Sequence, residues 1–389
     1  MIKSVLIKYL EKIGNQIKFG SLTIELPNGE TLNFSGKKGL NADLKLNSYK
    51  TVLRTIFGGH LGFAESYLKE EWTSSDLESF LEIMVTNLPD SFTPRSRIYI
   101  LYNKIIHFFR ENTKSRAKKN IIYHYDLGND FYRLWLDKTM TYSSGLFKDT
   151  KEDLSKAQEN KYQQIIDQLK IKSHHKILEI GCGWGGFAEY AAKEHGLRVT
   201  GLTLSNEQLV FARERIEALG LSDLVEFKLQ DYRDETGQYD GIASIEMFEA
   251  VGQKYWPSYF KVLRDCLKPG RHATLQIITV QDARWDVYQR GVDFIQKYIF
   301  PGGMLPSPSA LRTEIETAGL NVVRSLEFGE SYSQTLRRWH DVFNGKWDQV
   351  AALGFDERFR RMWNFYLTSC AATFSTSNCD VTQITVTNR

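Results

Sequence analysis

The chain has 389 residues and a mass of 44.9 kDa, which predicts two domains. Apolar residues make up 42% and charged residues 25%, near the average of folded globular proteins, so the composition argues against disorder, collagen-like repeats and disulfide scaffolds. No apolar stretch reaches the roughly 20 residues that a membrane-spanning helix needs. The N-terminus does not resemble a secretory signal, and the four scattered cysteines predict neither disulfides nor a metal site. We therefore expect a protein that stays inside the cell.

The small positive net charge is concentrated at the front of the chain. Residues 1–120 hold 18 Lys and Arg against 12 Asp and Glu. The densest part, RENTKSRAKK, follows the apolar run IYILYNKIIHFF, and we expect residues 96–120 to form a basic amphipathic linker helix. Such a helix could lie in a membrane interface or pack its apolar face on the next domain, and both interpretations stay open. The modest basic excess predicts no nucleic-acid partner.

Residues 1–95 predict a small α+β domain. The segment SLTIELPNGETLNFSG has two alternating runs around Pro-Asn-Gly, which is typical of a hairpin. Helical patterns follow in TVLRTIFGGHLGFAESYLKEEW and DLESFLEIMVTN. We expect this domain to associate with lipid or with a membrane surface.

From about Lys172 the pattern changes to strands that alternate with helices. The strands are predicted in HKILEI, LRVTGLTL, VEFKLQD, YDGIASIE and HATLQIITV, with helices between them. Such alternation predicts an α/β fold with a doubly wound sheet of parallel strands. This sheet belongs to a second domain over residues 121–389.

A glycine-rich loop, ILEIGCGWGG, joins the first of these strands to a helix. Gly181, Gly183 and Gly186 match the GxGxxG spacing of dinucleotide-binding folds. A dinucleotide site usually has an acidic residue at the end of the second strand, and this chain has Thr203 and Ser205 there, so a dehydrogenase is disfavoured. With Glu179 the loop reads E-x-G-x-G-x-G, which resembles motif I of class I S-adenosylmethionine-dependent methyltransferases.

Longer motifs carry a more specific resemblance. YHYDLGNDFY, MTYSSGLF, LEIGCGWGG, GLTLSNEQ, LQDYRD, SIEMFEAVG, KYIFPGGMLPS and YLTSCAATF together resemble the cyclopropane-fatty-acyl-phospholipid synthase family, also described as mycolic acid cyclopropane synthase-like. The resemblance implies a class I methyltransferase, Rossmann-like fold with a smaller N-terminal α+β domain. It also implies transfer of a methyl or methylene group from S-adenosylmethionine to the cis double bond of unsaturated phospholipid acyl chains, giving cyclopropane fatty acids. We expect a homodimer that is cytoplasmic and peripheral on the inner face of the membrane.

The resemblance also implies residue roles. The cofactor contacts would be Tyr142, Ser143, Glu179, Gly181, Gly183, Gly185, Thr203, Ser205, Gln208, Asp231 and Tyr232. Backbone N–H groups of the loop would receive the amino-acid end of the cofactor, and hydroxyl, amide and carboxylate groups would bond its ribose and adenine.

The family uses bound bicarbonate as the base that takes a proton from the cation formed on the acyl chain. Its ligands here would be Glu249, Tyr332 and the backbone at Ile278. Ser144 and Gln276 stand where the family usually has cysteine and histidine, and Ala250 also replaces a histidine. The side chains of Ser144 and Gln276 can still hydrogen-bond an anion, so we expect bicarbonate to bind.

A cysteine and three aromatic residues are further candidates for the reaction. Cys370 matches a cysteine often assigned as active in the family, although a buried helix cysteine is more often inert. Aromatic faces stabilise a cation without capturing it, which gives a role to Tyr142, Phe248 and Tyr332.

Several alternatives stay open at this point. The substitutions in the bicarbonate pocket leave room for a methyl-branched or methylene product. A small-amine N-methyltransferase shares much of the motif set. A lipid-binding protein with an inactive catalytic domain is a third possibility.

Overall fold

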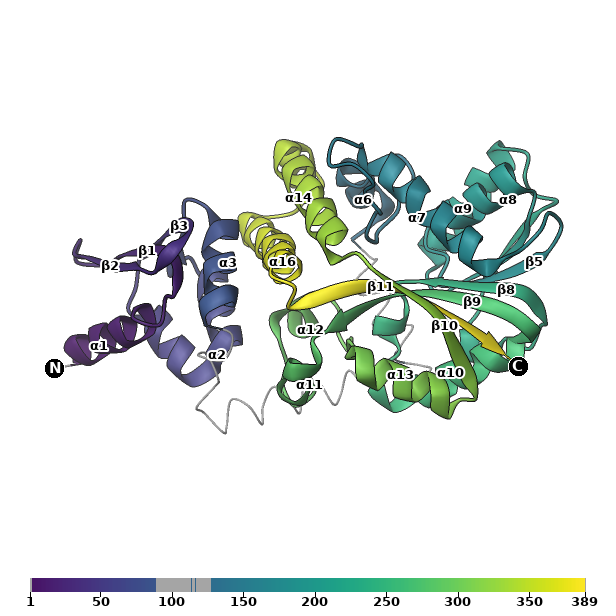
Figure 1. Ribbon diagram of the computed structural model, residues 1–389. Coiled ribbons are helices and arrows are strands. Elements are labelled where there is room, and N and C mark those ends of the chain that lie inside the picture. Colours follow the sequence, from purple (N-terminus) through teal and green to yellow (C-terminus); the bar gives the residue numbers. More distant parts are fainter. Residues whose placement is uncertain (1, 89–112, 114–115, 117–126, 389) are drawn as a thin grey trace.

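The structure is a computed structural model that describes residues 2–88, 113, 116 and 127–388 (Figure 1). The predicted linker helix over residues 96–120 lies outside the described residues, except for Thr113 and Arg116. Both predicted domain boundaries lie outside them as well.

A four-stranded sheet with three helices forms the N-terminal part of the chain. The strand order is β2-β1-β3-β4, and β1 and β2 pair antiparallel, which confirms the predicted hairpin. Side chains of β1 alternate between buried and exposed, as the sequence pattern indicates for a sheet with one covered face. The elements are α1 (Ile2–Gly14), β1 (Phe19–Glu25), β2 (Thr31–Ser35), β3 (Lys37–Leu46), α2 (Lys50–Leu68), β4 (Trp72–Thr73) and α3 (Leu77–Asn87).

The rest of the chain is built around a seven-stranded sheet of order β10-β11-β9-β8-β5-β6-β7, which confirms the predicted α/β class. The five strands β9, β8, β5, β6 and β7 pair in parallel. Its strands are β5 (Lys176–Ile180), β6 (Arg198–Thr203), β7 (Val225–Leu229), β8 (Tyr239–Ile245), β9 (Leu267–Val280), β10 (Leu320–Glu327) and β11 (Cys379–Asn388).

The sheet has two further strands at one edge, β10 and β11, which the sequence did not predict. β11 runs antiparallel to both β9 and β10. A long helix, α16, precedes β11 and delivers the chain to the opposite end of the sheet, so β11 enters between its two neighbours in the reverse direction. This inserted strand later matters for the site, because it carries Gln383.

Helices cover both faces of the central sheet (Figure 1). α7, α8 and α9 pack with β5, β6 and β7 on one face, and α10 and α13 pack on the other. The helices are α6 (Asn129–Trp135), α7 (Leu154–Leu169), α8 (Gly186–His195), α9 (Asn206–Ala218), α10 (Trp256–Cys266), α11 (Asp282–Tyr288), α12 (Phe294–Tyr298), α13 (Pro308–Thr317), α14 (Gly329–Gly345), α15 (Trp347–Ala352) and α16 (Glu357–Ser375). Three 3₁₀ turns, Tyr232–Asp234, Phe248–Ala250 and Gln253–Tyr255, follow strands β7 and β8.

The N-terminal part packs directly on α14 and α16 (Figure 1). Arg361 of α16 lies over the ring of Tyr67 at 4.0 Å and donates to the carbonyls of Tyr67 and Trp72. Lys297 pairs with Glu65 at 2.6 Å. Burial of apolar side chains from both parts in one continuous core is the main stabilising contribution to this contact.

No helix among the described residues is long and apolar enough to cross a membrane.

Candidate functional site

A pocket opens at the carboxyl ends of β5, β6 and β8. The chain moves outward from β5 to β6 in one direction and returns to β8 on the other side, so β5 lies at the point where the strand order reverses. Ligands of open α/β sheets bind at such a point. Its lining includes eight of the predicted cofactor residues: Tyr142, Ser143, Glu179, Gly181, Gly183, Thr203, Gln208 and Tyr232.

The glycine loop after β5 needs its glycines for conformation and for space. Gly181 and Gly183 have φ of 84° and 51°, in the left-handed region that favours glycine. A Cβ at Gly181 would lie 2.6 Å from Cγ of Met247, whereas a Cβ at Gly183 would have no neighbour within 4 Å. The loop is therefore closed against Met247 at its first glycine and open to the pocket at its second.

Glu179 is a buried carboxylate at the floor of the pocket, only 2% exposed. Its Oε2 has no hydrogen-bond partner among the described residues. Burial raises the pKa of Glu179 well above its ordinary value, while the positive charge of Lys161 acts in the opposite direction. A buried, unpaired carboxylate oxygen is costly unless a ligand supplies a donor or a cation.

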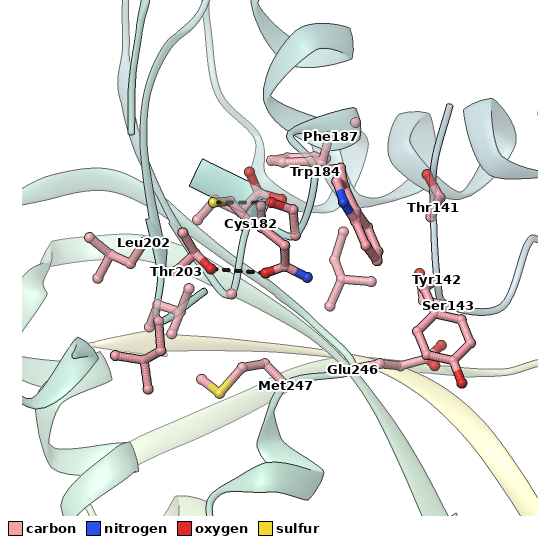
Figure 2. A pocket seen from close by; sticks show the side chains of 18 of the residues that line it. Thr141, Tyr142, Ser143, Cys182, Trp184, Phe187, Leu202, Thr203, Glu246 and Met247 are labelled. Carbon is pink, nitrogen blue, oxygen red and sulfur yellow. Dashed lines mark hydrogen bonds between the residues drawn. The ribbon is translucent and has the colours of Figure 1, made fainter. Parts of the chain in front are cut away.

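The other predicted cofactor residues divide into pocket residues and supporting ones. The Oγ1 of Thr203 donates to Oε1 of Gln208 at 2.9 Å, and both side chains are buried at one end of the pocket (Figure 2). Ser205 accepts from the Gln208 N–H and caps α9. Asp231 is bonded through both oxygens to the Arg233 guanidinium. Asp231, Ser205 and Gly185 do not line the pocket, so the structure gives them no direct place in it.

These features fit S-adenosylmethionine, which carries an ammonium and a sulfonium. The unpartnered oxygen of Glu179 is suited to a cation, and the space beside Gly183 admits close approach to the backbone. Gln208 and Tyr232 offer polar groups within the same lining.

The loop before α7 forms the opposite wall of the pocket. Figure 2 shows Tyr142 and Ser143 together with Glu246, across from Leu202 and Thr203. Nζ of Lys161, a fully buried residue of α7, donates to Oγ of Ser143 at 2.7 Å. Burial lowers the pKa of Lys161 to about 7, although Glu246, Asp137 and Glu179 all act to raise it. A buried lysine therefore holds this wall of the pocket in place.

The structure brings three of the six predicted catalytic residues together around Glu246, which the sequence analysis did not select. The Ser144 N–H and the Gln276 amide each donate to Oε1 of Glu246 at 2.8 Å, and the Tyr332 hydroxyl donates to Oε2 at 2.6 Å. The Ser144 hydroxyl turns away and bonds the Gly145 carbonyl. Glu246 also lines the pocket. It is thus the residue that connects the cofactor pocket to the predicted catalytic group.

Glu249 occupies a neighbouring position but has a different environment. Its Oε1 accepts from the Ile278 N–H at 2.7 Å, and its Oε2 has no hydrogen-bond partner among the described residues. Burial, reinforced by the charge of Glu246, raises the pKa of Glu249 to about 8. At neutral pH Glu249 therefore holds a proton, whereas the three donors around Glu246 favour its carboxylate form.

The donors predicted for bicarbonate are already engaged, so the described residues do not fit that anion. The N–H of Ser144, the amide of Gln276 and the hydroxyl of Tyr332 bond Glu246, and the N–H of Ile278 bonds Glu249. An added bicarbonate would meet the negative charge of Glu246 and no free donor from this group. The sequence motifs name these donors but do not show the carboxylates that they bond.

Two of the other predicted reaction groups, Phe248 and Cys370, lie in surroundings that do not suit their predicted roles. The Phe248 side chain is 1% exposed and packs against Trp256, Tyr259 and Phe260, away from the pocket lining. Burial raises the pKa of the Cys370 thiol on α16, so its thiolate is not available. Tyr142 and Tyr332 remain as aromatic faces near the site, since Tyr142 lines the pocket and Tyr332 bonds Glu246.

Glu246 and Lys161 were missed for different reasons. Glu246 follows β8 within the motif SIEMFEAVG, and its φ of 49° is rare for a residue with a side chain. Its place at the end of a parallel strand was a usable signal. Lys161 had no such signal, because nothing in KYQQII distinguishes a buried lysine from an exposed one.

The raised pKa of Glu249 gives a stability prediction. In the folded protein Glu249 stays protonated up to about pH 8, so its stabilising contribution is complete at low pH and is lost as the pH rises through 8. We expect Glu249→Gln, which stays neutral, to melt with the wild type at pH 5 and about 2 °C or more above it at pH 9. Thermal unfolding across this range measures the difference. A constant gap at all pH values would contradict the assignment.

Comparisons with known proteins identify the family of this chain. The sequence model of the mycolic acid cyclopropane synthetase family matches residues 112–384. A tuberculostearic acid methyltransferase of Mycobacterium tuberculosis is 38% identical over 84% of this chain and 79% of its own length. A cyclopropane-fatty-acyl-phospholipid synthase of Escherichia coli is 35% identical over 88% of this chain and 87% of its own length.

The fold has solved relatives as well. A crystal structure of a mycolic acid cyclopropane synthase complexed with SAH and CTAB is 29% identical, with a TM-score of 0.66, over 70% of this chain and 98% of the other. The sequence model, the relatives and the structure agree on one family. The chain belongs to the mycolic acid cyclopropane synthetase family, which confirms the predicted family and its class of S-adenosylmethionine-dependent methyltransferases.

Proposed function

We propose that the protein transfers a one-carbon group from S-adenosylmethionine to the cis double bond of unsaturated acyl chains in membrane phospholipids. The observation that carries this proposal is the end of the cofactor pocket, where the carboxylate of Glu246 and the ring of Tyr142 share one wall. An alkene methylation passes through a carbocation, so it needs an aromatic face and a base side by side. Methylation of an amine needs neither feature in this form.

When bound, S-adenosylmethionine supplies an electrophilic methyl group for the π electrons of the alkene. Glu179 would hold positive charge of the cofactor, and the glycine loop would receive its polar end. Tyr142, whose ring packs against Tyr132, Trp135 and Trp339, offers a fixed aromatic face that stabilises a cation without adding to it. The proposal needs no bicarbonate, because the donors expected for it bond Glu246 and Glu249.

Ring closure is the product that we propose first. Loss of a proton from the transferred methyl group closes a cyclopropane, as the name of the Escherichia coli relative indicates for that enzyme. A methyl-branched or methylene product is the second candidate, because the tuberculostearic acid methyltransferase has the higher identity to this chain, 38% against 35%.

The same proposal includes a location. Phospholipid acyl chains lie in a bilayer, so the enzyme must work at a membrane surface. Val5 on α1 and Phe57 on α2 are 61% and 55% exposed, which supports the N-terminal part as the membrane-facing one. We propose a homodimer that acts from the cytoplasm on the inner face of the membrane.

Incubation with S-adenosylmethionine and vesicles of monounsaturated phospholipid tests the function. We expect each modified chain to gain the mass of one CH₂ and to show cyclopropane protons by NMR, and the protein to sediment with the vesicles. Methyl or methylene signals would select the second product. No gain in mass, with the cofactor still bound, would contradict lipid methylation and direct attention to small amines.

A further inference from the structure

Glu246 stands in the place that the sequence resemblance reserves for an external base. Three of the donors expected for bicarbonate, from Ser144, Gln276 and Tyr332, converge on its carboxylate at 2.6–2.8 Å. These groups come from the loop before α7, from β9 and from α14, which are far apart in the sequence. Their convergence on one side chain forms an anion-binding site, and the anion that occupies it is the carboxylate of Glu246.

The two carboxylate oxygens of Glu246 are not equivalent. Oε1 accepts from both the Ser144 N–H and the Gln276 amide, whereas among the described residues Oε2 accepts from the Tyr332 hydroxyl alone. A carboxylate oxygen can accept about two hydrogen bonds. Oε2 therefore retains the capacity to take a proton, and Glu246 lines the pocket in which the cofactor is expected.

A chain of buried amides fixes the direction of the Gln276 side chain. The Gln383 amide donates to Oε1 of Gln276 at 3.0 Å, so the amide nitrogen of Gln276 faces Glu246. Gln168 donates to Gln383 at 3.3 Å and accepts from the Thr385 hydroxyl at 2.6 Å. Gln276 and Gln383 are both 0% exposed. Fully paired buried networks of this kind hold a side chain in one orientation.

The backbone of Glu246 adds independent support. Its φ of 49° lies in the left-handed region, where glycine is the favoured residue. Non-glycine residues in such conformations concentrate at functional sites, because the surrounding structure must compensate for the strain. Here the strained position carries the side chain that all three donors contact.

We propose that Glu246 is the catalytic base of this enzyme and takes the part that bicarbonate has in the family pattern. This inference rests on the proposed lipid methylation. Its failure is nevertheless distinguishable from failure of that function, because a bicarbonate-dependent wild type would still methylate lipid.

The proton-transfer step balances without any further reactant. The alkene π electrons form the new C–C bond to the methyl carbon, and the electrons of the broken C–S bond remain on sulfur. The cation left on the acyl chain then loses a proton from the new methyl group to Oε2 of Glu246, and the C–H electrons close the ring. Glu246 becomes a neutral carboxylic acid and returns its proton to water when the product leaves.

The surroundings suit such a base. Burial raises the pKa of Glu246, while Tyr332, Lys161, Gln276 and Ser144 lower it by favouring the carboxylate. A base with a pKa moved toward neutrality removes a proton more effectively than an ordinary carboxylate in water does. Glu249, with its pKa near 8, stays protonated beside it and adds no second negative charge at neutral pH.

The test uses two substitutions of Glu246 and one control in the full-length protein. Glu246→Gly removes the carboxylate and relieves the backbone, and it frees three donors for an external anion. Glu246→Gln keeps the side-chain volume and removes the base. Glu70→Gly is the matched control, because Glu70 has a φ of 57° and an exposed side chain in the N-terminal part.

Activity on phospholipid vesicles is measured in buffer freed of carbon dioxide and again with added bicarbonate. We expect wild type and Glu70→Gly to be equally active in both buffers. Both Glu246 variants should fall by roughly 100-fold or more without bicarbonate. Added bicarbonate should restore at least a tenth of the activity of Glu246→Gly and none of that of Glu246→Gln, whose amide still fills the site.

Two results would overturn the inference. One is a wild type that loses activity when bicarbonate is removed. The other is Glu246→Gln with near-normal activity. Circular dichroism and cofactor binding of each variant report folding separately, and folded, cofactor-binding Glu246→Gly that bicarbonate fails to restore would also count against the assignment.

Discussion

Glu179→Gln is expected to bind S-adenosylmethionine at least 10-fold more weakly than the wild type while the unliganded protein becomes more stable. The two effects have one cause. Oε2 of Glu179 is buried and unpartnered among the described residues, so folding favours the neutral acid at a cost in stability, and the carboxylate becomes useful when a cation arrives. Glutamine removes this cost together with the charge, and a charged hydrogen bond is worth about 1.5–3 kcal/mol.

Calorimetry also detects the proton that this carboxylate exchanges. Because burial raises the pKa of Glu179 well above its ordinary value, the free protein holds a proton there that a bound cation should displace. Binding to the wild type should therefore release a proton, which appears as a dependence of the binding enthalpy on the buffer. Glu179→Gln should show no such dependence.

Glu226→Gln is the matched control, since Glu226 lies on β7 and its side chain is 67% exposed. It should match the wild type in affinity, proton release and melting temperature. Unchanged affinity of Glu179→Gln would remove this carboxylate from the cofactor site. Weaker binding combined with a lower melting temperature would instead point to a structural role.

The parts of the fold that the sequence predicted are those with local signals. β5 reads as an apolar run interrupted by Glu179, and it is buried from Ile177 onward, as strands between two layers of helices are. β11 carried no such signal. Its central residues are buried but include Thr382, Gln383 and Thr385, whose polar groups are paired with other side chains. A strand whose buried face is polar does not show the apolar pattern on which the prediction depends.

The same contrast applies to the site. The glycine loop was predictable because its tight turn and open approach are properties of consecutive residues. Glu246 was not, because its role depends on donors from three separate elements. The resemblance named Ser144, Gln276 and Tyr332, and the structure places all three in contact with Glu246. It could not show that these residues already share a carboxylate.

Lys161→Met is expected to reduce the rate of product formation by roughly 100-fold and to leave the protein folded. Lys161 is fully buried, bonds Oγ of Ser143 and lowers the pKa of Glu246 through its charge. Methionine has a similar length without the charge. Glu246 would then hold its proton to higher pH, so the rise in activity on the acid side of the pH profile should move to higher pH.

Lys161→Met should lower activity but raise the stability of the folded protein relative to wild type as the pH falls. The pKa of Lys161 is lowered from 10.5 to about 7, so the folded wild type loses stability as the pH falls toward 7, because the unfolded chain already holds the proton that the buried amine lacks. The stability of Lys161→Met relative to wild type should therefore increase between pH 8.5 and pH 6. Lys156→Met, on the exposed face of the same helix, should alter neither profile. If Lys161→Met is slower but its pH profile is unchanged, the role of Lys161 is to position Ser143. A shifted profile would establish that this buried cation sets the proton affinity of the base.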